Sequence, residues 1–208
     1  MSAKKSRKSK VKKVVDKWKE KEWYDVVSPP YIGDKFLGET IADDPEKLKG
    51  RIIEMSKMGL RNDLFYDINL KLGFRIINVD GNIAKTEFIG HEVAKEQIRS
   101  QIRRNRSRIE IIQNVTTKDK GKLRVYTIII TPIRTGTSRQ KAIRHDLISL
   151  LVQTATEHNF DSYVLKMVNG ELVEKVKETI NKLVPTVMVD IRKSKVLSLP
   201  PKTVEAAS

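Results

Sequence analysis

The side chains of this sequence whose types and spacing indicate chemistry are cations, and they indicate binding rather than catalysis. Residues 1–22 carry a net charge of +7, residues 95–108 carry +5 and residues 134–145 carry +4, within a formal net charge of +15 over 208 residues. The rest of the chain is therefore close to neutral. Charge that serves only solubility is scattered, so this clustering predicts a surface for a polyanion. The residues predicted to contact it are Lys4, Lys5, Arg7, Lys8, Lys10, Lys12, Lys13, Lys19 and Lys21 in the first tract, Lys95, Arg99, Arg103, Arg104, Arg106 and Arg108 in the second, and Arg134, Arg139, Lys141 and Arg144 in the third.

The second tract has helical spacing. Lys95, Arg99, Arg103 and Arg106 recur every three or four residues, which places them on one face of a helix predicted over residues 91–104. Arginine dominates this tract, and its planar guanidinium matches phosphate and stacks on bases better than a lysine ammonium does. The spacing therefore predicts a row of phosphate contacts along one helix.

The third tract surrounds the start of a helix predicted over residues 138–157, with Thr137 or Ser138 as its N-cap. Cations are unfavourable at that end of a helix, because the macrodipole is already positive there. Together with the free N–H groups of the first turn, however, they form a phosphate site. Arg134 in the preceding loop adds to the same patch.

RNA is the favoured polyanion. The sequence has no helix-turn-helix or zinc-finger spacing, and arginine-rich segments that order on binding are typical of RNA partners. Trp18, Trp23 and Tyr24 adjoin the first tract and can stack on exposed bases. For Trp23 and Tyr24, packing in the core is an equally weighted alternative. Without such DNA-binding motifs, DNA is not an expected partner. A membrane is not expected either, because no stretch approaches the ~18 apolar residues of a membrane span.

No catalytic residue, metal site or cofactor is predicted. The three histidines, His91, His145 and His158, match no metal-ligand spacing, and cysteine is absent. Neither a glycine-rich phosphate loop nor a serine nucleophile elbow occurs. No apolar segment of the signal-peptide kind follows the basic start of the chain, so we expect a soluble intracellular protein.

The clearest structural pattern lies in residues 64–76, where every even position is apolar. The segment is predicted to be a long half-buried strand, bent or bulged at Gly73. Asp80-Gly81 then marks a tight hairpin turn into the next strand. The even positions are Leu64, Tyr66, Ile68, Leu70, Leu72, Phe74 and Ile76.

Similar patterns predict the other elements. They predict an α+β fold whose mainly antiparallel strands form a curled sheet or a β-barrel-like core, with about three interspersed helices. A disordered basic arm, a single globular domain and a flexible tail are predicted over residues 1–22, 23–199 and 200–208. Further strands are predicted over 51–57, 82–90, 108–117, 122–131 and 187–197, helices over 91–104, 138–157 and 171–184, and a short helical turn at Asp43-Asp44-Pro45.

Two blocks of the sequence resemble a known family of small-subunit ribosomal proteins of archaea and eukaryotes, the S-three-A (e-S-one) family. The first block is Lys21-Glu22-Trp23-Tyr24-Asp25-Val26, followed by Ser28-Pro29-Pro30. The second comprises Leu48-Lys49-Gly50-Arg51, Glu54, Ser56, Leu60, Asn62 and Asp63. The resemblance continues through residues 138–157 and Asn181-Lys182-Leu183-Val184-Pro185, and the short chain is similar to the archaeal branch.

The resemblance implies a structural role in the small ribosomal subunit during translation, in the cytoplasm. It also implies small-subunit rRNA and neighbouring ribosomal proteins as partners, messenger RNA near the exit as a further partner, a β-barrel-like core and no catalytic residues. The alternative is a non-ribosomal RNA-binding chaperone or ribosome-assembly factor with the same basic tracts. A metal-dependent nuclease would need clustered acids that the sequence lacks.

Overall fold

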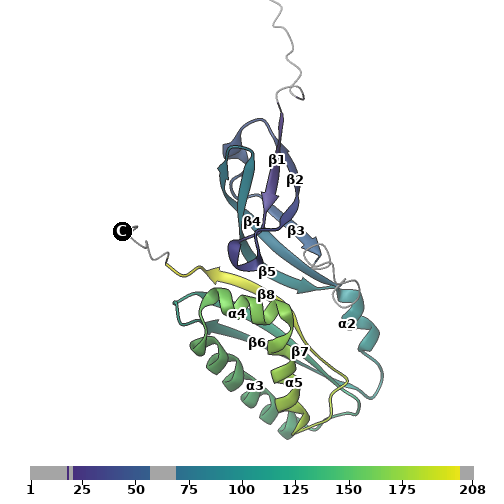
Figure 1. Ribbon diagram of the computed structural model, residues 1–208. Helices are drawn as coiled ribbons and strands as arrows, with labels where there is room; N and C mark the ends of the chain where they lie inside the picture. Colours follow the sequence, from purple (N-terminus) through teal and green to yellow (C-terminus); the bar gives the residue numbers. More distant parts are fainter. Residues whose placement is uncertain (1–17, 19–20, 57–68, 202–208) are drawn as a thin grey trace, which may run out of the picture.

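The structure is a computed structural model that describes residues 18, 21–56 and 69–201. Within these residues the chain forms eight strands, four α-helices and two short 3-10 helices (Figure 1), which confirms the predicted α+β class. The strands are β1 (Glu22–Val27), β2 (Phe36–Ala42), β3 (Ile52–Ser56), β4 (Leu70–Asp80), β5 (Ile83–Val93), β6 (Ser107–Thr116), β7 (Lys122–Thr131) and β8 (Met188–Ser198). The helices are α2 (Lys95–Gln101), α3 (Thr137–Glu157), α4 (Phe160–Asn169) and α5 (Glu171–Asn181), with 3-10 turns η1 (Pro30–Ile32) and η2 (Pro45–Leu48).

The strands form one mixed sheet in which β5 is the branch point. The strand order is β2-β1-β5-β8-β7-β6, and β4 pairs with the other edge of β5 and carries β3. The first residues of β5 pair with β1 in parallel, whereas Glu92 near its end pairs with Lys193 of β8. Figure 1 shows the result, in which β1 to β5 form an upper group of strands and β6 to β8 form a lower group with three of the helices.

The sheet is open, so the predicted barrel is wrong. Among the described residues, β2, β3 and β6 each pair along one edge only. Because β5 pairs with β1 at its start and with β8 at its end, the strands diverge in two directions and the edges of the sheet do not meet. A side chain joins β2 to the start of β3 instead: Arg51 Nη1 donates to the Ile41 carbonyl oxygen at 3.1 Å and to the Thr40 hydroxyl.

Strand β4 confirms the period-two pattern in the part that the structure describes. The pairing register with β5 shifts at Gly73, where the bulge is predicted. The strand begins at Leu70 and continues to Asp80, beyond the predicted end at 76, and residues 64–68 lie outside the described residues. Up to residue 76, the exposed odd residues are Lys71 and Arg75, and the even residues that are at most 1% exposed are Leu72, Phe74 and Ile76.

Gly90 allows β5 to approach β8 closely. A Cβ atom at this position would lie 2.2 Å from the backbone oxygen of Ser194, far inside van der Waals contact. Its partner across the β4–β5 pair, Gly73, has room, because a Cβ atom there would lie 3.5 Å from the Gly90 oxygen. The two paired glycines therefore have different tolerances for a side chain.

We expect Gly90→Ala to lower the free energy of unfolding by about 3 kcal/mol, because β5 and β8 must separate where the added methyl group meets backbone. Gly73→Ala is the matched control, and we expect it to change the stability by less than about 1 kcal/mol. Urea unfolding followed by circular dichroism measures both variants. Equal unfolding midpoints for the two would contradict the assigned packing.

Helix α2 is shorter than the helix predicted over residues 91–104, so that prediction is wrong at both ends. Residues 91–93 extend β5 and pair with β4, and the helix spans only Lys95–Gln101. Ile98 is buried, but Ile102 is 39% exposed and has an extended backbone. The apolar stripe that would sustain a longer helix therefore stops after one buried residue.

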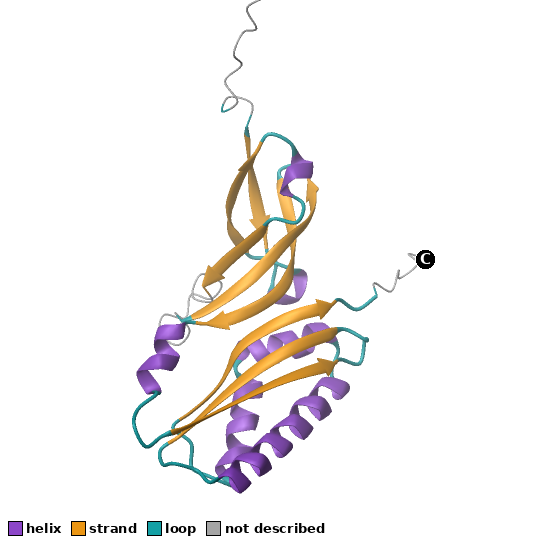
Figure 2. Cartoon of the chain, turned by 180° about the vertical axis from the view of Figure 1, so that it is seen from behind, coloured by secondary structure: helices purple, strands orange, loops and turns teal. Residues whose placement is uncertain are grey.

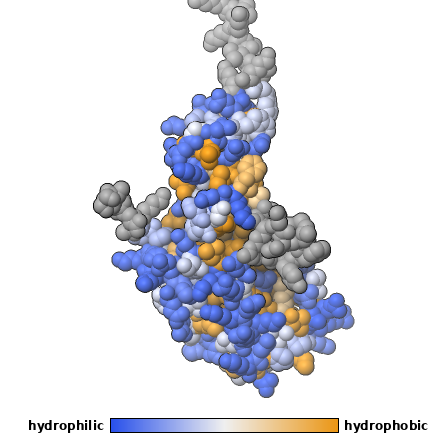
Figure 3. All heavy atoms as spheres, viewed as in Figure 1, coloured by the Kyte–Doolittle hydropathy of each residue, from blue (hydrophilic) through white to orange (hydrophobic). Residues whose placement is uncertain are grey.

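Helices α3, α4 and α5 cover one face of the β6–β8 strands, and Figure 2 shows the opposite face in front of them. Helix α3 closely matches its prediction. Helix α5 ends at Asn181 rather than 184, so Leu183 is 43% exposed. Figure 3 shows a mostly hydrophilic outer surface over the lower, helical part of the molecule, as expected for helices whose apolar sides face a sheet.

Helix α4 is absent from the sequence-based prediction, although its apolar residues have helical spacing. Asp119 Oδ2 accepts the backbone N–H of Phe160 at 3.3 Å at the start of this helix, and Gly170 ends it with a φ of 91°. The sequence signal is an apolar stripe at intervals of three, one, three and one. Its buried residues are Phe160, Tyr163, Val164, Met167 and Val168.

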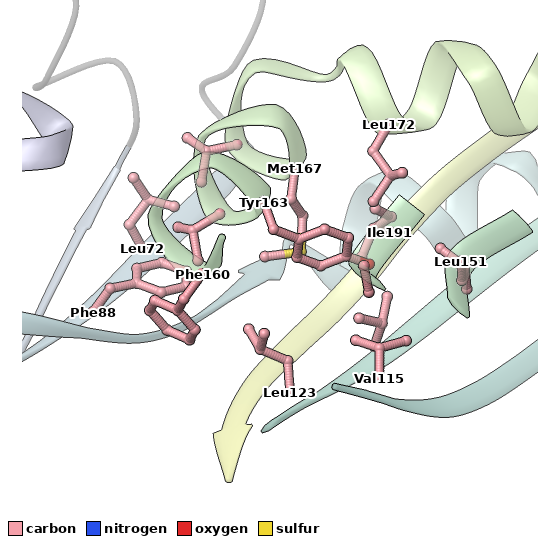
Figure 4. Close-up of a cluster of buried hydrophobic side chains, with 14 of the residues drawn as sticks. Leu72, Phe88, Val115, Leu123, Leu151, Phe160, Tyr163, Met167, Leu172 and Ile191 are labelled. Atoms are coloured by element: carbon pink, nitrogen blue, oxygen red, sulfur yellow. The ribbon is translucent and has the colours of Figure 1, made fainter. Parts of the chain in front are cut away.

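Helix α4 carries the hydrophobic core from the upper strands to the lower ones (Figure 4). Phe160 lies beside Leu72 and Phe88 of the upper strands, whereas Tyr163 and Met167 lie toward the lower sheet. One cluster of buried residues therefore spans both groups of strands.

Candidate nucleic-acid interface

The first basic tract lies almost wholly outside the described residues, which include Trp18 and Lys21 but none of the other predicted contacts from Lys4 to Lys19. The Lys21 ammonium lies 4.0 Å from the centroid of the Trp18 ring, in a cation–π contact. Two of the aromatic residues weighed for base stacking differ in environment. Tyr24 is 4% exposed and packs in the core, whereas Trp23 is 58% exposed.

The second tract does not form one helical row, and the prediction of a single cationic helix face is therefore wrong. Lys95 and Arg99 lie on α2, whereas Arg103 and Arg104 are exposed in the loop that follows it. Arg106 lies at the end of this loop, partly buried, and its Nη1 donates to the Gln101 carbonyl oxygen at 2.7 Å. That guanidinium satisfies the C-terminal end of α2 and is therefore partly structural.

Arg108 also has a protein partner. It lies in β6, where its Nε donates to the Glu110 carboxylate at 3.1 Å. Arg192 of β8 donates to the same carboxylate oxygen at 3.0 Å. One acid therefore holds two of the cations near this end of the sheet, and Arg108 is less available to RNA than its exposure implies.

The third tract lies at the start of α3, as predicted, but with a different cap. Gly136, rather than Thr137 or Ser138, occupies the N-cap position, and no side chain caps the helix. Gln140 Nε2 instead donates to the Thr135 carbonyl oxygen at 2.9 Å and fixes the loop onto the helix. The first-turn N–H groups of α3 are therefore not occupied by a capping side chain, which is the arrangement that suits an anion.

A buried hydroxyl cluster joins the second and third tracts. Ser107 begins β6 and pairs with Thr131 at the end of β7. The Ser107 Oγ accepts the Thr135 N–H at 2.8 Å, and the Thr135 Oγ1 lies 3.2 Å from the Thr131 Oγ1. All three side chains are at most 9% exposed. The loops at 102–106 and 132–136 are thus fixed side by side at one end of the lower sheet.

The loops and the start of α3 together present exposed cations that are far apart in the sequence. We call this set the merged basic surface. It consists of Arg103, Arg104, Arg134, Arg139 and Lys141, and Arg144 is partly buried behind it. Arginine forks beside an uncapped helix start can bind phosphate groups through charge-assisted hydrogen bonds.

One histidine, His91, is a buried part of the contact between β5 and β8. His91 is 4% exposed, its Nε2 lies 2.9 Å from the Ile191 carbonyl oxygen, and its Nδ1 lies 2.8 Å from the Ser194 hydroxyl. Since the carbonyl can only accept, Nε2 carries the proton and the Ser194 hydroxyl donates to Nδ1. No group of three metal-ligating residues occurs in the part of the chain that the structure describes. None of the described helices has the length and apolar character needed to cross a membrane.

Comparison with known proteins assigns the chain to a family. Residues 9–200 match the model of the Ribosomal S3Ae family. The chain belongs to this family. The resemblance predicted from the Lys21–Val26 and Leu48–Asp63 blocks is therefore confirmed, and the family consists of ribosomal structural proteins rather than enzymes.

Several archaeal members of the S3Ae family are similar over nearly the whole chain. "Small ribosomal subunit protein eS1" of Desulfurococcus amylolyticus is 40% identical over 187 residues, which cover 90% of this chain and 87% of that protein. The protein of the same name from Methanocaldococcus jannaschii is 40% identical over 193 residues, covering 93% and 86%. That of Methanobrevibacter smithii is 41% identical over 187 residues, covering 90% and 96%.

Proposed function

We propose that this chain is a structural constituent of the small ribosomal subunit that binds small-subunit rRNA in translation and catalyses no reaction. The relatives that match at least 90% of this chain carry the name of such a protein. The observation that carries RNA binding is the merged basic surface, whose two loops are joined by the Ser107–Thr135 hydrogen bond. Its place in the cell is accordingly the cytoplasmic ribosome, beside other small-subunit proteins.

The binding mode follows from the chemistry of this surface. The exposed start of α3 offers backbone N–H groups, and Arg134 and Arg139 lie on either side of it. In the free protein these cations are repelled by the positive end of the α3 dipole. A phosphate bound there attracts both the cations and the dipole, so RNA stabilises this arrangement. Each phosphate contact releases counterions, which makes the affinity dependent on salt.

The rest of the chain is assigned by the same reasoning. Residues 23–199 act as one domain, which the continuous core through α4 supports. The basic arm over residues 1–22 adds phosphate contacts through its lysines, and residues 200–208 form a tail. Messenger RNA near the exit of the small subunit is a further proposed partner, and it rests on the family resemblance alone.

Sedimentation distinguishes a ribosomal constituent from an assembly factor or chaperone. We expect the protein to remain with small subunits after a high-salt wash, because many phosphate contacts and protein neighbours hold a constituent at once. Quantitative mass spectrometry should find it in near one-to-one amount with other small-subunit proteins. A translation factor known to bind the subunit reversibly is the control. Release of this chain together with that factor would instead support the alternative.

A further inference from the structure

The lower sheet has one face without helices. Helices α3 to α5 lie on one side of β6, β7 and β8, and Figure 2 shows the other side uncovered in front of them. Helix α2 closes only one end of this face, where Ile98 packs against Ile128 and Ile130. We call the remainder, formed by alternate residues of the three strands, the open sheet face.

Strand pairing aligns the side chains of the open sheet face in rows. One row crosses the strands as Ile112, Tyr126 and Lys193. The next row crosses them as Asn114, Arg124 and Lys195. Ile112 is 61% exposed and Tyr126 is partly exposed. The face therefore has an apolar and aromatic centre with cations beside it.

Two acids near this face have cationic partners. Glu110 accepts from Arg108 and Arg192, and Glu92 forms an ion pair with Lys193. The hydrogen bond from Lys193 holds the pKa of the Glu92 carboxyl below its usual range, so that pair is charged at neutral pH.

Three further cations of this face have no ion pair with an acid among the described residues. Arg124 Nε donates to the uncharged Asn114 side chain at 2.8 Å. Lys122 and Lys195 are exposed, and no ion pair joins them to an acid among the residues that the structure describes. These three cations lie together on one side of the apolar and aromatic centre, and they favour an anionic partner.

A cleft of about 490 Å³ borders the open sheet face on its β5 side. Its lining includes Gly73 and Gly90, which pair in β4 and β5. Lys193 and Lys195 line both the cleft and the open sheet face, so the two are continuous. The volume lies within the ~300–1,000 Å³ of sites that hold small organic groups, such as a single base or nucleotide.

We propose that the open sheet face binds a segment of single-stranded RNA, with a base stacked against Tyr126 and Ile112 and phosphates at Lys122, Arg124 and Lys195. Successive side chains on one face of a strand lie about 7 Å apart. Lys122 and Arg124 on β7 therefore offer cations at this interval to a chain of phosphates. An aromatic ring among cations on a sheet is a recurrent platform for single-stranded RNA.

The proposal differs from the function proposed above, because the open sheet face shares none of the residues of the merged basic surface. An acidic peptide is the competing occupant. It would use the same cations but would gain nothing specific from a flat aromatic ring, whereas every base has a face that can stack.

Fluorescence anisotropy with the full chain and a labelled oligouridylate of about ten nucleotides tests the proposal. We expect Tyr126→Ala to weaken binding roughly 5- to 150-fold, the range for loss of one stacked base, and Tyr126→Phe to retain it. Arg124→Gln with Lys195→Gln should flatten the log–log salt slope by about 1.4 units. Lys175→Gln with Lys177→Gln on α5 is the control of equal charge.

Circular dichroism and thermal unfolding show whether each variant is folded. If Tyr126→Ala unfolds, crosslinking of 4-thiouridine RNA to the wild-type chain tests the same contact by locating the crosslinked peptide. Binding that Tyr126→Ala leaves unchanged, or crosslinks confined to other peptides, would overturn the proposal. Equal competition by polyglutamate would overturn it too, and would assign the face to an acidic peptide.

Discussion

We expect Phe74→Asp to leave the chain without a cooperative thermal unfolding transition. Phe74 in β4 is fully buried and meets the Phe88 ring edge-on, with the ring centroids 6.1 Å apart. A carboxylate at this position would be buried without a partner, which costs at least several kcal/mol. Because a whole domain is stable by only about 5–15 kcal/mol, this single change removes most or all of the stability. Differential scanning calorimetry measures it.

Two neighbours on the same strand are the controls. Lys71→Asp introduces the same side chain on the exposed face, so its transition should stay within a few degrees of the wild type. Leu70 is half-buried at the start of β4, and Leu70→Asp should fall between the two. If Phe74→Asp and Lys71→Asp unfold at the same temperature, the assignment of the even positions to the core is wrong.

The parts of the fold that sequence predicts well are those whose signal is local. The β4–β5 hairpin follows from alternation and from Asp80-Gly81, and the β6–β7 hairpin follows from two strands around a short turn. Helix α4, although absent from the prediction, carries a local signal of equal quality in the helical spacing of its apolar residues. In each of these segments, the local spacing of apolar and turn residues is enough to predict the secondary structure.

Features that depend on distant pairing are not predictable in this way. The end of β5 at His91 to Val93 has residues that also suit a helix, and it becomes a strand because β4 pairs with it. Nothing local indicates that β5 shares its edge between β1 and β8, and this sharing is what keeps the sheet open. The predicted barrel fails for this reason.

The candidate interface also combines features that local sequence indicates with contacts between distant strands that it does not indicate. Composition singled out the second and third tracts, but the helical spacing of the second tract suggested a single row that the structure does not form. The two tracts meet because Ser107 pairs with Thr131, a contact between strands that sequence spacing cannot reveal. Cations at alternate positions, such as Lys122 with Arg124 and Lys193 with Lys195, form no dense tract, and a search by period two would have found them.

The merged basic surface makes a quantitative prediction about salt. We expect replacement of Arg103, Arg134 and Arg139 by Gln to flatten the log–log dependence of small-subunit RNA affinity on salt by about two units, since each phosphate contact contributes about 0.7–0.9. These residues are exposed and come from both loops and the start of α3. Arg106 and Arg108 are left unchanged because the Gln101 carbonyl and Glu110 hold them.

The control removes the same charge elsewhere, through Lys118, Lys175 and Lys177 changed to Gln. All three are exposed, and they lie in the β6–β7 turn and on α5, outside the merged basic surface. A long-range effect of net charge alone would act on both triple variants equally, whereas counterion release requires contact with phosphate. The control slope should therefore stay close to that of the wild type. Equal flattening in the two variants would mean that RNA responds to the total charge of the protein, and the merged basic surface would lose its assigned role.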